Sequence, residues 1–226
     1  RIHYWFNDYV KIGVTGNKDE EADTENSLQG ADLTLRASSE SWLKLETGRT
    51  KGPGSGVADS DDGGYNFDEA DPLGDNEIDA SAHRIDISLG FKDIVENGHG
   101  RITFYRQDRE AGYSAPGQTT DRDVSQYGGT VEMPFGESVQ TRIKMGKQIQ
   151  EEGLETESGD VNLDYRINKN WVLSSGLRHD KREDNSIIVP QTQEEGERTD
   201  AVVKMKYDSG ARWAVPSESA TPCHQR

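Results

Sequence analysis

Charged side chains recur at alternate positions within the apolar segments of this chain, and they are its best candidates for chemistry. If the strands that carry them close into a barrel around a wide aqueous lumen, charges that line the lumen tune the passage of ions or solutes. If the lumen is narrow, they pair across neighbouring strands and fill it. Both interpretations stay open from the sequence. The candidate lumen-lining residues are Arg36, Lys44, Glu46, Arg84, Asp86, Arg101, Glu132, Arg142, Lys144, Asp164, Arg166 and Arg178.

An acidic segment between residues 59 and 77 is a second candidate site. Asp59, Asp61 and Asp62 offer the oxygen ligands that calcium prefers. The segment lacks the EF-hand spacing, in which a Glu stands at the twelfth position. A solvated acidic loop is therefore the favoured interpretation. Weak, non-specific binding of divalent cations is the alternative.

No other pattern predicts catalysis, a cofactor or a metal site. The five histidines include no pair at the i, i+4 spacing of a helical metal site. The single cysteine, Cys223, excludes a disulfide within the chain. The Gly-rich run 52–56 lacks the Lys-Ser/Thr ending of a phosphate-binding loop. A glycan-processing enzyme would need two paired carboxylates, and no pair is singled out by position. We therefore expect a protein that is not an enzyme.

Composition narrows the class of protein further. The net charge of −16 disfavours nucleic-acid binding, because phosphate recognition needs a basic surface. Hydrophobic residues make up 31% of the chain, and the mean hydropathy is −0.91. A soluble globular domain usually contains more apolar residues than this. The chain is therefore expected to have only a thin apolar face.

The charged residues alternate with apolar ones, which predicts strands. Residues 9–14, 31–37 and 84–91 place apolar side chains mainly at every second position, the period of a strand with two different faces. Strands of roughly 8 to 11 residues suit tilted membrane-spanning strands. Tight turns alternate with long loops, predicted at 17–27, 51–80, 110–123, 150–158 and 181–198. The predicted fold is all-β: an antiparallel up-and-down meander of about 11–12 strands, forming a transmembrane β-barrel or an incomplete part of one.

Aromatic residues gather near the predicted tight turns. Aromatic side chains collect at membrane–water boundaries, where an apolar body and a polar edge both find partners. The residues that lie in or within four positions of a tight turn are Tyr4, Trp5, Phe6, Tyr9, Trp42, Phe91, Phe135, Tyr165, Trp171, Tyr207 and Trp213. This placement favours a barrel girdle, although aromatics are also common in strands of any kind.

Three segments resemble a known family. Gly112–Gln118, Trp171–Arg178 with Asp180–Asp184, and Val189–Val203 are similar to parts of very large Gram-negative outer-membrane proteins. Those proteins combine long repeat regions with a β-barrel portion and are often labelled OmpA family. The resemblance extends to about Trp213. It implies the fold and a bacterial outer-membrane location, and it transfers no catalytic residue.

The chain is expected to divide near residue 213. Residues 1–213 would form the outer-membrane β-barrel segment. Residue 1 is predicted to lie inside a strand, so we expect an internal piece of a longer protein. Residues 214–226 contain two prolines and no alternation. They are predicted to be an irregular tail, arising from truncation or a frameshift, or as a disordered natural end.

Two functional hypotheses follow. The first is an integral outer-membrane β-barrel segment with a structural, anchoring or passive permeation role, and with outer-membrane lipid and lipopolysaccharide as its partners. The second is a secreted or surface β-sandwich adhesin that binds a partner through its acidic loops. What the apolar face contacts separates them: lipid in a barrel, a second sheet in a sandwich.

Overall fold

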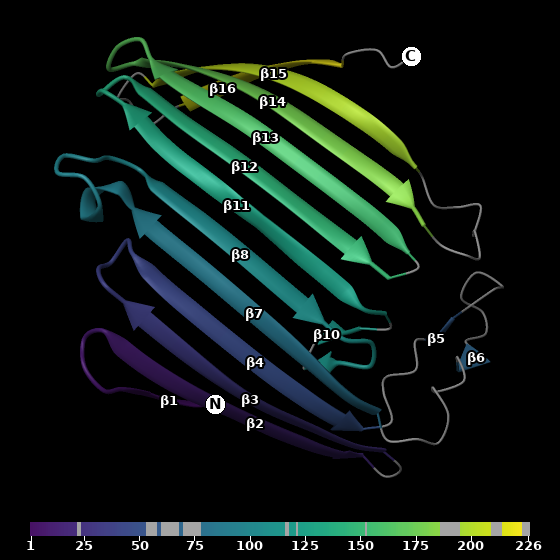
Figure 1. Cartoon of the computed structure of the whole chain (residues 1–226). Coiled ribbons are helices and arrows are strands. Elements are labelled where there is room, and N and C mark those ends of the chain that lie inside the picture. The colour runs from purple at the N-terminus through teal and green to yellow at the C-terminus, as the bar shows by residue number, and fades with distance from the viewer. Residues whose placement is uncertain are drawn as a thin grey trace. The chain divides into compact units, whose positions relative to one another are not determined.

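The computed structural model describes most of the chain, and nearly all of the described backbone is β-structure (Figure 1). The described residues are 1–21, 24–52, 58–59, 68–69, 78–115, 118–120, 122–151, 153–185, 195–208 and 214–222. For 19–21, 24–26, 58–59, 68–69, 118–119 and 214–222, only the backbone is described. The predicted all-β class is confirmed. No helix among these residues is long and apolar enough to cross a membrane.

Twelve strands form one antiparallel sheet whose hydrogen-bonded neighbours follow chain order. They are β1 (Ile2–Trp5), β2 (Val10–Glu21), β3 (Thr24–Arg36), β4 (Trp42–Gly52), β7 (Ile78–Gly90), β8 (Arg101–Arg109), β11 (Val124–Phe135), β12 (Val139–Gln150), β13 (Leu154–Arg166), β14 (Trp171–Asp184), β15 (Gly196–Asp208) and β16 (Ala214–Pro222). The predicted up-and-down meander of about 11–12 strands is confirmed. Strands β1 and β16 are the edges, so the described sheet is not closed into a barrel.

Five short elements lie in the described parts of the connections. β5 (Ala58–Asp59) pairs with β6 (Asp68–Glu69), and β9 (Ser114–Ala115) pairs with β10 (Gln118–Thr119). A 3₁₀ helix, η1 (Phe91–Asp93), follows β7 directly.

The chain forms two compact units, which we describe separately. Unit 1 comprises Arg1–Ala37, Trp42–Asp86 and Arg106–Ser125. Unit 2 comprises Ser38–Ser41, Ile87–Tyr105 and Gln126–Arg226.

Asparagine side chains build two of the tight turns. Asn7 Oδ1 accepts hydrogen bonds from the backbone N–H groups of Tyr9 and Val10, each at 2.8 Å. Asn168 Oδ1 accepts from Asn170 at 2.9 Å and from Trp171 at 3.0 Å. An Asn that bonds to the backbone two or three residues later stabilises a turn locally. The sequence therefore dictates these reversals without help from distant packing.

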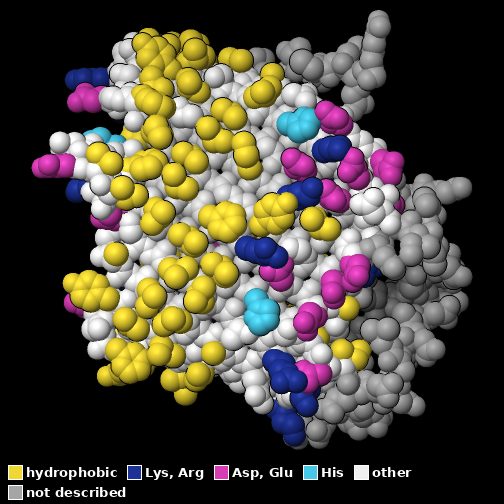
Figure 2. All heavy atoms as spheres, viewed as in Figure 1, with side chains coloured by type: hydrophobic (Ala, Val, Ile, Leu, Met, Phe, Trp, Pro, Cys, Tyr) yellow, Lys and Arg dark blue, Asp and Glu magenta, His cyan; other side chains and the backbone are white. Residues whose placement is uncertain are grey.

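The strand register gives each unit one apolar face and one charged face. Residues directly opposite each other in an antiparallel pair share a face. In unit 1, Leu33 on β3 stands between Ile12 on β2 and Leu45 on β4. In unit 2, Val161 on β13 stands between Ile143 on β12 and Leu177 on β14. Figure 2 shows hydrophobic side chains spread over the face turned to the viewer.

The described residues bury very little apolar side chain. The buried hydrophobic residues are Ala80, Ala82 and Val124, all of them small or medium in size. Large apolar residues instead stay exposed, among them Met145 at 63% and Leu177 at 52%. A water-soluble domain buries such side chains in a core. The described part of the chain lacks a core of that kind.

Two predicted loops are largely strand. Residues 22 and 23 alone separate β2 from β3, and β12 and β13 are separated by residues 151–153. The predicted loops at 17–27 and 150–158 are therefore wrong over most of their length. Backbone ladders need no apolar side chains, so the pairing continues through acidic residues beyond the apolar segments. The main strands consequently reach 14 residues in β14.

The irregular tail predicted for 214–226 is also wrong over Ala214–Pro222, which forms β16. This strand pairs with β15 from Asp208 opposite Ala214 to Asp200 opposite Pro222. Proline is tolerated on an edge strand, where its missing N–H faces away from the ladder. Residues 223–226 lie outside the described residues.

Candidate functional site

The apolar face of unit 2 ends in a row of charges near the loop ends of the strands. Directly opposite pairs place Lys147, Glu157, Lys181 and Glu197 side by side on β12 to β15. The next row toward the tight turns is Met145, Gly159, His179 and Thr199. Apolar residues follow beyond that row. The face is therefore an apolar band that ends in a row of alternating charges on the loop side.

A histidine–threonine pair marks this boundary in each unit. His83 Nδ1 lies 3.0 Å from Thr47 Oγ1 in unit 1. His179 Nδ1 lies 3.0 Å from Thr199 Oγ1 in unit 2. Neither histidine has the i, i+4 spacing of a helical metal site, and sequence reasoning missed their shared position at the edge of the apolar band. The sequence does contain a signal for this position: each histidine lies at the point in its strand where the apolar alternation stops.

Aromatic residues gather at the opposite, tight-turn end. Trp171 and Tyr207 face each other on β14 and β15 with ring centroids 4.7 Å apart. Trp5 instead lies on the charged face of unit 1, stacked against Arg36, whose guanidinium carbon is 4.6 Å from the ring centroid. The predicted girdle thus divides between the two faces. Trp213 lies outside the described residues.

The charged face of unit 1 contains five of the predicted lumen-lining residues: Arg36, Lys44, Glu46, Arg84 and Asp86. Lys44 Nζ lies 2.7 Å from Glu46 Oε1. Arg84 Nε lies 2.7 Å from Asp86 Oδ2. The Arg36 guanidinium donates to the Asp8 carbonyl at 2.9 Å. Two of these contacts, Lys44–Glu46 and Arg84–Asp86, are ion pairs, so the face carries charges of both signs in contact.

Asp32 belongs to the same face and was missed by sequence reasoning. It stands opposite Gly13 and Glu46. Its side chain is 4% exposed, and Oδ1 accepts a 2.9 Å bond from Arg1. Oδ2 accepts no hydrogen bond from any described residue. The sequence signal for Asp32 was Gly13, because a glycine opposite Asp32 leaves space for the carboxylate to lie against the sheet.

The other seven predicted residues lie on the charged face of unit 2. Glu132 bridges two of them: its Oε2 lies 3.0 Å from Arg101 Nη2, and its Oε1 lies 2.9 Å from Arg142 Nε. Lys144 stands opposite Asp160. Arg178 also stands opposite Asp160, and its Nε lies 2.6 Å from Asp180 Oδ2. Sequence reasoning missed Asp160 and Asp180.

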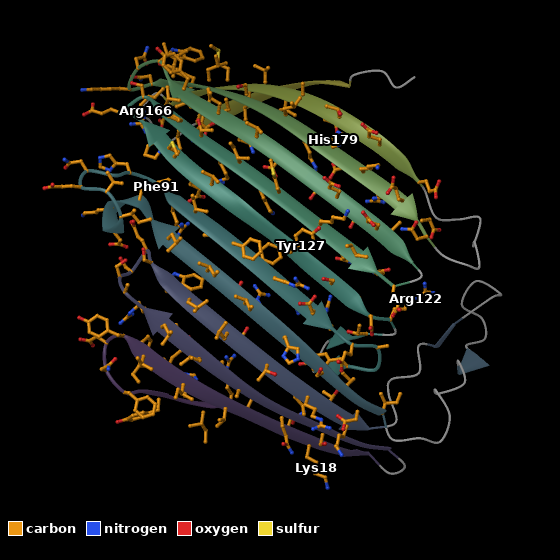
Figure 3. All side chains as sticks on the ribbon, in the orientation of Figure 1. Lys18, Phe91, Arg122, Tyr127, Arg166 and His179 are labelled. Atoms are coloured by element: carbon orange, nitrogen blue, oxygen red, sulfur yellow. The ribbon has the colours of Figure 1, made fainter. Side chains whose placement is uncertain are left out.

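Asp164 and Arg166 lie closer to the tight turns. They line a cavity of about 350 Å³ with Lys204 and Lys206 of β15. Figure 3 labels Arg166 at this end of β13. The charged face is therefore more basic here than in its middle. All twelve predicted residues lie on the charged faces, and their lining of a lumen stays a prediction.

A connection folds back over the charged face of unit 1. The Tyr113 hydroxyl lies 2.8 Å from the point that a Cβ on Gly48 would occupy. Ser114 N–H donates to Thr50 Oγ1 at 3.3 Å, and Ser81 N–H donates to Glu110 Oε2 at 2.7 Å. Burial raises the pKa of the Tyr113 hydroxyl. The sequence predicted a long loop at 110–123 and gave no sign that it packs against the charged face.

A second contact joins the turn 38–41 to η1 at the tight-turn end of unit 2. Asp93 Oδ2 accepts hydrogen bonds from Ser38 Oγ and Ser41 Oγ, both at 2.5 Å. The hydrogen bond from Ser38 has the largest effect and that from Ser41 the next largest, and both lower the pKa of the Asp93 carboxyl. Ser88 Oγ donates to the Glu40 carbonyl at 2.6 Å, and Ser88 is fully buried. The turn 38–41 therefore caps the end of β7.

The predicted divalent-cation candidates cannot be built into a site from the described side chains. Asp59 belongs to β5, of which the backbone alone is described, and Asp61 and Asp62 lie outside the described residues. Over the described ranges, no group of three or more His, Cys, Asp or Glu side chains is placed to hold a metal ion.

Comparison with known proteins adds no relative. No family model matches the chain, no curated protein matches it, and no solved structure matches it. The outer-membrane family resemblance therefore stays a prediction.

Proposed function

We propose that this chain is part of an integral β-barrel of a bacterial outer membrane, with a structural, anchoring or passive permeation role. In this proposal the apolar faces contact lipid and lipopolysaccharide, and the charged faces line the interior. One observation carries it. Large apolar side chains stay exposed on one face, whereas several charged side chains on the opposite face form ion pairs.

The surface-adhesin alternative makes a different demand on the apolar face. In a β-sandwich a second sheet packs about 10 Å away and covers the apolar side chains. The described residues supply a single main sheet and no such cover. Bilayer hydrocarbon is a covering layer that needs no further protein, which favours the barrel proposal.

Refolding tests the proposal. The full chain is diluted from denaturant into buffer with or without dodecyl maltoside micelles, and far-UV circular dichroism and unheated gel mobility are recorded. Strand signal and heat-sensitive mobility that appear only with micelles are expected. A cooperative β-fold in plain buffer would contradict the proposal and favour the soluble adhesin.

A further inference from the structure

A groove crosses the apolar face of unit 2, and its lining is amphipathic. Its volume is about 470 Å³, which lies within the usual range of ligand sites. Its apolar wall is formed by Met145, Val161 and Leu177, one from each of β12 to β14. Tyr127 of β11 and His179 of β14 also line it and are labelled in Figure 3.

Gly159 makes the hollow. It stands opposite Met145 on one side and His179 on the other. A Cβ added at Gly159 would meet nothing within 4 Å. Each neighbouring strand presents a side chain at this level, so the missing side chain leaves a depression in the middle of the apolar band.

The end of the groove nearer the loops carries charges of both signs. Lys147 and Glu157 both line it and stand directly opposite each other. Lys147 Nζ also pairs with Glu155. A purely anionic headgroup would meet the carboxylates, and a purely cationic one would meet the lysine. A zwitterionic headgroup complements both, with its phosphate toward Lys147 and its ammonium toward Glu157.

We propose that this groove binds a zwitterionic phospholipid, with one acyl chain against Met145, Val161 and Leu177 and the headgroup between Lys147 and Glu157. This inference rests on the proposed membrane insertion of the sheet. It adds a specific lipid site to a face that would otherwise contact lipid without preference.

The test uses the full chain inserted into vesicles that contain equal amounts of phosphatidylethanolamine and phosphatidylglycerol. After mild extraction into micelles, retained lipid is counted by native mass spectrometry. Phosphatidylethanolamine should be retained in preference. Gly159→Leu fills the hollow and should lower retention roughly tenfold. The matched control is Gly16→Leu, because Gly16 also lies on the apolar face with open space above it, and retention should not change.

A second variant keeps the proposal testable if Gly159→Leu fails to insert. Glu157→Gln removes the partner of the ammonium and should lower the preference for phosphatidylethanolamine by up to about fivefold. Insertion without preferential retention, or preferential retention of added lipopolysaccharide, would overturn the lipid site and leave the proposed function intact. Failure of the unmodified chain to insert would overturn both.

Discussion

The Tyr105 hydroxyl lies 2.9 Å from the position that a Cβ on Gly128 would occupy. The ring comes from β8 and covers a bare stretch of backbone on β11, on the charged face of unit 2. The Met145 carbonyl oxygen is closer still, at 2.5 Å from the same position. Glycine is therefore required at 128 by close packing from two sides, because any side chain would displace backbone as well as the ring.

Gly128→Ala should destabilise the folded sheet by about 1–3 kcal/mol, the usual cost of overpacking. Gly159→Ala is the matched control, because its Cβ meets nothing and the strand conformation suits alanine. It should be neutral or stabilising by up to about 1 kcal/mol. Denaturant unfolding of both variants in micelles checks the difference. Equal stability of the two variants would contradict the packing described for Tyr105.

The sequence predicts those parts of this arrangement that rest on interactions between residues close together in the chain. The alternation from Arg84 to Phe91 predicts the two faces, and Asn7 and Asn168 predict their turns, because these signals are local. The Tyr105–Gly128 contact joins residues distant in sequence, so no local pattern reveals it.

Strand ends were predicted less well than strand faces. The segments Lys18–Glu21 and Thr24–Ser27 are polar, and their pairing depends on a ladder already started by Val10–Val14. Composition alone therefore ended β2 too early and began β3 too late. The candidate site shows the same division. All twelve predicted charges share the charged faces, whereas Asp32, Asp160 and Tyr113 are found only once the neighbouring strands are in place.

An arginine on the apolar face should be far more costly than one on the charged face. Leu163 and Asn162 are neighbours on β13 and face opposite sides. In bilayers, Leu163→Arg should lower the free energy of unfolding by about 2–4 kcal/mol, because lipid solvates the charge poorly. Asn162→Arg should change it by less than about 1 kcal/mol. Urea titration of folding into vesicles measures both, and similar losses would undo the face assignment.

The Arg101–Glu132–Arg142 bridge should contribute little to stability. Arg142 is 57% exposed and Arg101 is 45% exposed, so water screens both ion pairs. Glu132→Gln is expected to lower the free energy of unfolding by less than about 1 kcal/mol. The measurement is chemical unfolding at low and high salt, where high salt should shrink the difference further. A loss of several kcal/mol would show that the bridge lies in a dry interior.

Asp93 should make stability fall in acid. Hydrogen bonds from Ser38 and Ser41 lower its folded-state pKa below the ordinary value of 3.8. The stabilisation is therefore fully present above that value and is lost as the pH falls through the folded-state pKa. Asp93→Asn should be less stable than the unmodified chain near neutral pH, and the gap should close in acid. A gap that stays constant through that range would exclude the ionised carboxylate as its source.

The central claim is that one face of the sheet contacts lipid and the other does not. A spin-label scan over Asp160, Val161, Asn162 and Leu163, in a Cys223→Ser background inserted into vesicles, tests it most directly. Labels at Val161 and Leu163 should collide with lipid-soluble oxygen and be shielded from a water-soluble nickel chelate. Labels at Asp160 and Asn162 should lack that oxygen exposure. Loss of the two-residue alternation, or free access of the nickel chelate to Val161 and Leu163, would contradict the membrane account.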